Sequence, residues 1–172
     1  AGDADGAAST LRDWTKAHPD DKGVIAMLGT YDLAARRFED AKRELETAFD
    51  TLSQDPVVLN NLAWVYQKTG DSRARSMAER AYLINPNLPQ TKDTLAWILV
   101  QQGQPQSAIG LLQEASSADP KNPEIRYHLA AALNMTGRRE QAVQILTELV
   151  NAPATFDGRP EAEKLLAELS KK

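Results

Sequence analysis

The sequence predicts an all-α solenoid built from antiparallel helix pairs, because one pattern returns along the chain at a nearly constant interval. Leu62-Ala63-Trp64 returns as Leu95-Ala96-Trp97 and as Leu129-Ala130-Ala131, and a fainter copy begins at Leu28-Gly29. The leucines of successive copies are separated by 34, 33 and 34 residues. Self-similarity at one fixed period of this size is typical of repeat arrays and not of a single globular core.

The second half of each repeat carries its own pattern of small and apolar residues. An alanine is followed four residues later by an apolar or small residue, and three residues after that by another, which places all three on one helix face. The residues are Ala41, Leu45 and Ala48; Ala74, Ala78 and Ala81; Ala108, Leu112 and Ala115; and Ala142, Leu146 and Leu149. Ala63, Ala74, Ala96, Ala108, Ala130 and Ala142 are expected where helices cross closely, and a larger side chain there would overpack, at a cost of roughly 1–3 kcal/mol.

Taken in order, the chain is predicted to be a single array over residues 1–172. Residues 1–6 are small and acidic, and we expect a frayed start. A helix over 7–18 follows, in which Ala7, Leu11 and Trp14 match the second-helix pattern. Because its own first helix is missing, we favour a piece cut from a longer repeat protein over a native N-terminal capping helix.

Four complete repeats are predicted next, at 22–55, 56–88, 89–122 and 123–156. Prolines 56, 89 and 123 open the last three, where the first-turn N–H has no helical partner to lose. A longer loop at 150–158 leads to a last helix at 159–170. Its stripe of Ala162, Leu165, Leu166 and Leu169 is expected to cap the end of the stack.

Composition narrows the classes of function. The net charge of −4 argues against a nucleic-acid binder, which needs a basic surface, so no nucleic-acid partner is expected. There are no cysteines and only two histidines, His18 and His128, and we expect no catalytic residues, no cofactor and no metal site. The mixed-charge group of Arg36, Arg37, Lys42 and Arg43 is expected to be a solvated helix face.

The repeat resembles the tetratricopeptide-repeat (TPR) family, with Leu-Gly/Ala in the first helix, glycine at the turn, the alanine pattern in the second helix and a closing proline. The resemblance implies a right-handed superhelix whose first helices line a groove with their second, fifth, ninth and twelfth residues. Those residues are Gly23, Ala26, Thr30 and Leu33; Val57, Asn60, Trp64 and Gln67; Gln90, Asp93, Trp97 and Val100; and Glu124, Tyr127, Ala131 and Asn134.

Nine of these residues are our candidates for binding a protein or peptide segment. They are polar or aromatic, and tryptophan and tyrosine are the side chains that most often anchor a partner. The alternative for Trp64 and Trp97 is packing between neighbouring first helices. The candidates are Asn60, Trp64, Gln67, Gln90, Asp93, Trp97, Glu124, Tyr127 and Asn134.

The sequence of the repeats over about 57–169 looks like the C-terminal part of bacterial TPR lipoproteins of the PEP-CTERM/exopolysaccharide type. Examples are Asn60-Asn61-Leu62-Ala63-Trp64, Asp93-Thr94-Leu95-Ala96-Trp97 and Glu161-Ala162-Glu163-Lys164-Leu165-Leu166. The resemblance implies a non-catalytic periplasmic scaffold, held at the outer membrane by an anchor upstream of this sequence. Such proteins accompany exopolysaccharide production or export, or surface-protein sorting.

Three other interpretations stay open. A cytoplasmic TPR adaptor or cochaperone would share the same repeats. A direct polysaccharide-binding module could stack sugar rings on Trp64 and Trp97. Self-association through the open N-terminal helix would cover apolar surface that a missing helix leaves exposed.

Overall fold

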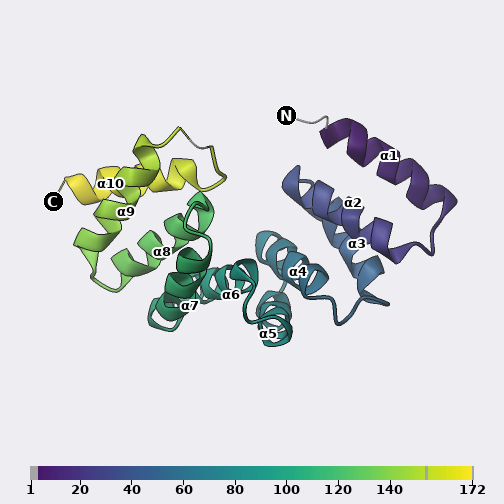
Figure 1. Cartoon of the computed structure of the whole chain (residues 1–172), viewed down its shortest axis with the longest axis horizontal. Helices are drawn as coiled ribbons and strands as arrows, with labels where there is room; N and C mark the ends of the chain where they lie inside the picture. The colour runs from purple at the N-terminus through teal and green to yellow at the C-terminus, as the bar shows by residue number, and fades with distance from the viewer. Residues whose placement is uncertain (1–3, 154, 172) are drawn as a thin grey trace. The chain divides into compact units, whose positions relative to one another are not determined.

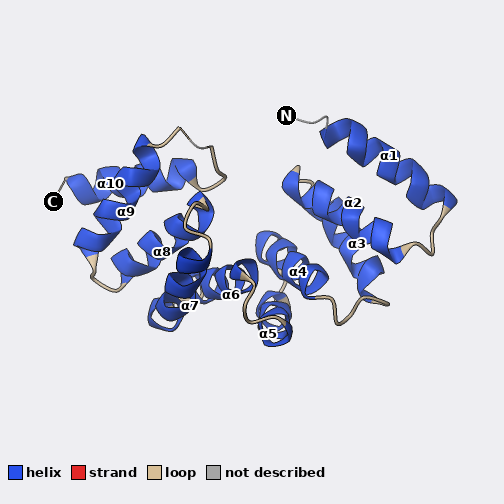
Figure 2. Ribbon diagram, in the orientation of Figure 1, coloured by secondary structure: helices blue, strands red, loops and turns tan. Residues whose placement is uncertain are grey.

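The computed structural model describes residues 4–153 and 155–171, which form ten α-helices and no strand (Figures 1 and 2). The predicted all-α fold of antiparallel helix pairs is confirmed. Ala154 and the first three residues of the expected frayed start lie outside the described residues, and the first helix begins at Ala4. The helices are α1 (Ala4–Ala17), α2 (Lys22–Ala34), α3 (Phe38–Phe49), α4 (Pro56–Thr69), α5 (Ala74–Ile84), α6 (Pro89–Gln101), α7 (Pro105–Ala118), α8 (Pro123–Met135), α9 (Arg139–Asn151) and α10 (Arg159–Ser170).

The helices group into two compact units, with α1–α5 in the first and α6–α10, from Pro86 onward, in the second. In the first unit α2 pairs with α3 and α4 pairs with α5, while α1 packs on α2 and α3 on α4. In the second unit α6 pairs with α7 and α8 with α9, while α7 packs on α8 and α10 on α9. First helices also touch directly, α2 with α4 and α8 with both α6 and α10.

Local chemistry fixes where the helices begin and turn. The Asp55 carboxylate accepts from the backbone N–H groups of Val57 and Val58 at 2.8 and 3.2 Å, and Pro56 occupies the first turn of α4. After α4 the chain turns at Gly70 with a φ of 72°, a conformation that glycine adopts without strain. The equivalent residue of the first repeat is Arg36, which also has a positive φ, 60°.

The second-helix pattern forms the core of each unit. All twelve residues predicted for this face are no more than 4% exposed. Gly29 marks the closest approach, because a Cβ added there would lie 2.8 Å from Leu45 Cγ and 3.3 Å from the Leu45 backbone nitrogen. Small side chains therefore set the distance between the paired helices.

The sequence pattern predicted the wrong inward-facing residues at the two ends of α1. Ala8 is the fully buried alanine, and Trp14, which the pattern placed on the inner face, is exposed. The Trp14 indole N–H donates to Asp21 at 3.1 Å, and its ring lies 4.0 Å from the ring of His18. The inner face carries Arg12 instead, and its guanidinium pairs with the buried Asp32 of α2.

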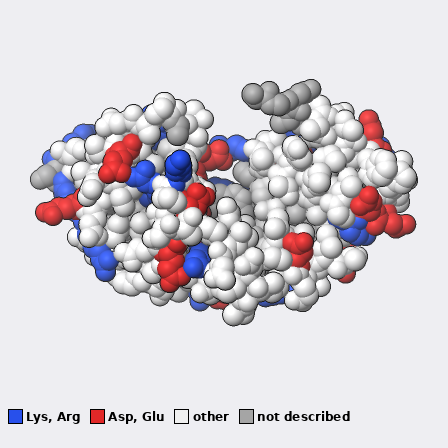
Figure 3. All heavy atoms as spheres, in the orientation of Figure 1, with Lys and Arg blue, Asp and Glu red and all other residues white. Residues whose placement is uncertain are grey.

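Charged side chains of both signs are interspersed on the surface. On the face shown in Figure 3, basic and acidic atoms lie close together and do not separate into single-sign patches. None of the described helices is long and apolar enough to cross a lipid bilayer. Within residues 4–153 and 155–171, the His, Asp and Glu side chains form no cluster of three suited to a metal ion.

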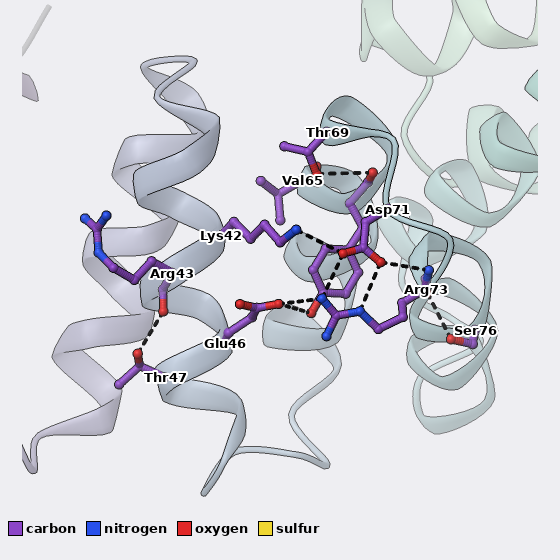
Figure 4. Close-up of polar contacts among 10 residues, drawn as sticks. Lys42, Arg43, Glu46, Thr47, Val65, Thr69, Asp71, Arg73 and Ser76 are labelled. Carbon is purple, nitrogen blue, oxygen red and sulfur yellow. Dashed lines mark hydrogen bonds and ion pairs between the residues drawn. The ribbon is translucent and has the colours of Figure 1, made fainter.

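The prediction that this mixed-charge group is solvated is wrong for Lys42 and Arg37, because both side chains hold helices together. Lys42 reaches from α3 to Asp71 in the α4–α5 turn, with 2.9 Å between Nζ and Oδ2 (Figure 4). Arg73 bridges Asp71 and Glu46 at 2.8 and 2.7 Å. Hydrogen bonds from Arg73 and Lys42 hold the pKa of the Asp71 carboxyl well below its usual range.

A second network lies beneath α1. The fully buried Asp32 pairs with Arg12 and Arg37 and lies next to Glu44 of α3. Burial, then the hydrogen bond and charge of Asp32, raise the pKa of Glu44 to about 7. Although burial opposes it, hydrogen bonds from Arg37 and Arg12 keep the pKa of Asp32 below its ordinary value.

Candidate partner-binding surfaces

The first unit contains an open apolar crevice between the first helices α2 and α4. Its volume is about 290 Å³, close to the lower limit of roughly 300 Å³ for ligand pockets. The exposed walls are large and apolar, with Met27 51% and Val57 52% exposed and Tyr31 also accessible. The full lining is Gly23, Ala26, Met27, Thr30, Tyr31, Leu52, Asp55, Val57 and Val58.

The crevice is open because small residues occupy the facing positions of α2. Gly23 and Ala26 supply little bulk, and the Asp55 cap and Pro56 fix the start of α4 beside them. The Asn61 amide donates to the Thr30 hydroxyl at 2.9 Å, which ties α2 to α4 at one end. Gly23, Ala26, Thr30 and Val57 belong to the positions that the TPR resemblance assigned to the groove.

The three candidates on α4 do not line this crevice. Trp64 is half-buried, with the Lys68 ammonium 4.5 Å from the centre of its ring. Asn60 has a buried side-chain oxygen for which the structure shows no hydrogen-bond partner, and Gln67 is half-buried. Their role in binding a partner stays a prediction.

The second unit brings four of the candidates together around His128, for which the sequence predicted no catalytic or metal-binding role. His128 is 1% exposed, and its ring stacks on Trp97 with 4.0 Å between ring centres. Its Nδ1 lies 2.8 Å from Asp93 Oδ1, and its Nε2 lies 3.6 Å from Glu124 Oε1. Tyr127 packs beside both rings, at 5.7 Å from each.

The loop before α10 closes over this cluster. The ring centres of Phe156 and Tyr127 are 6.4 Å apart, and the Gly158 N–H donates to Glu124 Oε2 at 3.2 Å. A Cβ added at Gly158 would lie 2.6 Å from Tyr127 Cδ1, so the backbone rests directly on the tyrosine ring. Tyr127 is only 8% exposed, and its burial, then the charges of Glu161 and Glu124, raise its pKa to about 12.

The arrangement around His128 resembles an acid–base pair but suits packing. A carboxylate orients the imidazole, as a general base requires. However, Trp97 covers the ring face, and the nearly complete burial leaves no path for a substrate to the ring nitrogens. Gln90 is exposed, and Trp97, Glu124 and Asn134 are half-buried, so these four second-unit candidates retain accessible surface, whereas Asp93 and Tyr127 are buried.

Sequence reasoning missed the residues that make the crevice accessible and those that close the second-unit cluster. Met27, Tyr31 and Leu52 lie outside the four groove positions that we considered. The small residues Gly23 and Ala26 at two groove positions of the first repeat were the one feature of the sequence that indicated an open groove there. Nothing in the repeat pattern indicated that Phe156 and Gly158 would fold onto Tyr127.

Comparison with known proteins agrees with the fold. A tetratricopeptide-repeat family model matches residues 99–169. No curated protein gives a significant match. Together with the helix pairs, the family model supports the TPR assignment of the repeats.

Solved structures with a similar fold include proteins described as TPR proteins. A thermophilic TPR protein of Thermus thermophilus is similar with a TM-score of 0.75 and 20% identity, over 95% of this chain and 91% of that one. MamA is similar with a TM-score of 0.67 and 19% identity, over 97% and 86% of the two chains. YrrB, described as a TPR protein with an unusual peptide-binding site, has a TM-score of 0.66 and 18% identity, over 95% and 84%. At these identities the likeness shows the fold alone.

Proposed function

We propose that this chain is a non-catalytic scaffold that binds an extended segment of a partner protein in the crevice between α2 and α4. The TPR fold supports a protein-interaction scaffold in general. The observation that carries the specific proposal is the open crevice of about 290 Å³, whose walls include the exposed side chains of Met27, Tyr31 and Val57. The peptide-binding site named for YrrB, a protein of similar fold, is consistent with this use.

The physical case rests on preorganisation. The crevice walls are helices held by the Asp55 cap and the Thr30–Asn61 hydrogen bond, so a ligand would not have to order them. Binding to fixed walls reduces the conformational entropy lost on association. Exposed apolar side chains that surround a concave site also lose contact with water when a partner covers them.

The cellular setting is a separate part of the proposal. The resemblance of residues 57–169 supports a bacterial envelope assembly linked to exopolysaccharide production or export, or to surface-protein sorting. In that setting the protein would be periplasmic and reach the outer membrane through an upstream anchor. Fractionation of the source organism, with the native protein detected by antibody, tests this location, and recovery in the cytoplasm would overturn it.

Affinity capture from the source organism's extract tests the binding site. The variant Ala26→Tyr fills the crevice, and Ala167→Tyr adds the same side chain at an exposed position of α10. We expect the wild type and Ala167→Tyr to retain a partner that Ala26→Tyr loses while its helicity is intact. Equal retention by all three proteins would overturn the crevice as the binding site.

The tryptophan candidates are tested in the same capture experiment. If Trp64→Ala and Trp97→Ala keep the partner, both side chains serve packing, and the circular dichroism spectra and stabilities of these variants will show it. If Trp64→Ala loses the partner while its stability is unchanged, α4 binds the partner outside the crevice as well; if Trp97→Ala does so, α6 carries a binding surface of its own.

A further inference from the structure

Two of the places where consecutive first helices meet, α2–α4 and α8–α10, are related by the repeat register. Ala26 and Tyr127 are both the fifth residue of their repeats, and Gly23 and Glu124 are both the second. Val57 and Gly158 each follow those second residues by 34 positions. The structure respects this register, because Val57 shares the crevice with Gly23 and Ala26, while Gly158 contacts Glu124 and Tyr127.

The space beside the fifth residue of the repeat is filled between α8 and α10 and empty between α2 and α4. Between α8 and α10 the tyrosine ring of residue 127 occupies it, packed against Phe156 and the backbone of Gly158. Between α2 and α4 the fifth residue is Ala26, and a crevice of about 290 Å³ remains. The fold therefore displays, in its own second unit, the kind of side chain that this location accommodates.

The walls of the empty location suit an aromatic ring. Tyr31 offers an accessible ring, and Met27 offers a thioether, a group that makes favourable contacts with aromatic rings. Val57 and Val58 supply apolar side chains where the backbone of Gly158 lies in the other pair.

Charge complementarity indicates what lies next to the ring. Asp55 is the only charged residue in the described lining, and it uses Oδ1 to cap α4. Asp21 lies close to the same end of the crevice, 3.6 Å from a Cβ built on Gly23. Two carboxylates at one end favour a cationic neighbour and disfavour an acidic one.

We propose that the partner segment inserts a tyrosine or phenylalanine side chain into the α2–α4 crevice and places a lysine or arginine next to it, against Asp55. This inference rests on the proposed function and adds the identity of the anchoring residues. A polysaccharide or a nucleic acid does not combine these two features in one chain.

Nuclear magnetic resonance titration of the whole chain tests the inference directly. The probes are the blocked dipeptides N-acetyl-Tyr-Arg-amide, N-acetyl-Leu-Arg-amide and N-acetyl-Tyr-Glu-amide, observed through the methyl groups of Met27, Val57 and Val58. We expect the Tyr-Arg probe to bind about two- to tenfold more tightly than Leu-Arg. It should also bind about two- to fivefold more tightly than Tyr-Glu.

Two variants serve as controls. Ala26→Tyr should abolish the methyl shifts, because its new side chain takes the place of the probe. Asp55→Asn keeps an oxygen able to cap α4, so the fold is retained, but it removes one of the two charges and should reduce the preference for the Arg probe over the Glu probe.

Failure of the inference is distinguishable from failure of the proposed function. Binding of all three dipeptides with equal affinity, or an unchanged Arg preference in Asp55→Asn, overturns the inference. So does the absence of methyl shifts with both tyrosine probes at about 50 mM, where even millimolar affinity would saturate the site. The proposed function is judged separately, by whether Ala26→Tyr loses a captured partner.

Discussion

Adding one methyl group at two different helical glycines is expected to change stability in opposite directions. Gly29 and Gly110 both lie inside helices, α2 and α7, where alanine is intrinsically favoured by about 1 kcal/mol. At Gly110 a Cβ meets nothing within 4 Å, so Gly110→Ala should keep this gain of about 0.5–1 kcal/mol. At Gly29 the added Cβ meets Leu45 Cγ at 2.8 Å.

The contact at Gly29 cannot be relieved by a side-chain rotation alone. The Leu45 backbone nitrogen also lies 3.3 Å from the added atom, and Leu45 is fully buried, so α3 must move away from α2. Overpacking of this kind costs roughly 1–3 kcal/mol, which exceeds or cancels the gain in helix propensity. We therefore expect Gly29→Ala to lower the free energy of unfolding by up to about 2 kcal/mol.

Urea unfolding followed by circular dichroism at 222 nm measures both variants against the wild type. Because the chain contains two units, amide hydrogen exchange in α2–α3 and in α7 should report each change locally. A Gly29→Ala protein that is more stable than the wild type would refute the argument that the small residue sets the helix spacing. A Gly110→Ala protein that is less stable would refute the use of helix propensity at the exposed site.

Three further predictions follow from buried or strained groups. The pKa of Glu44 is raised from 4.5 to about 7, so between these pH values the folded chain holds a proton that the unfolded chain releases. The free energy of unfolding should therefore fall as pH rises from about 4.5 to 7. Glu44→Gln should remove this dependence in urea midpoints measured at pH 5, 6, 7 and 8. Arg36 has a φ of 60°, so Arg36→Gly should raise the free energy of unfolding by roughly 1 kcal/mol in urea denaturation, and an unchanged midpoint would contradict strain at this turn. Replacing His128 by leucine leaves the Asp93 carboxylate without its partner at 2.8 Å and should lower the free energy of unfolding by roughly 1–3 kcal/mol. A double variant in which leucine also replaces Asp93 should recover part of that stability. Simple additivity of the two changes in thermal unfolding would show that the two side chains are not coupled.

Most of the helical framework could be predicted from the sequence, because its determinants are local. The alanines and leucines spaced by three and four residues mark the inner face of each second helix, and all of them are buried. Proline and Asp or Asn fix helix starts, and glycine fixes the turns after α4 and α6. The turn at Arg36 shows the limit of this reasoning, since a non-glycine residue adopts the same conformation where the repeat requires it.

The candidate site could be predicted only in part. The groove positions assigned by the repeat register include Gly23, Ala26, Thr30 and Val57, which do line the crevice. The aromatic candidates were chosen for their chemistry, yet Tyr127 is buried under a loop and Trp97 stacks on a buried histidine. Residue type alone does not tell whether an aromatic ring faces a partner or fills a gap within the chain.

The sequence by itself determined the repeat period, the pairing of neighbouring helices and the buried small residues, because each depends on residues that are close along the chain. Tertiary structure alone decided which groove positions are open. The location between consecutive first helices is occupied at Tyr127 and empty at Ala26, and the difference depends on side-chain volume at one position and on a loop that begins some 25 residues further along. Whether the chain fills such a space itself depends on packing between distant segments, which no single repeat records.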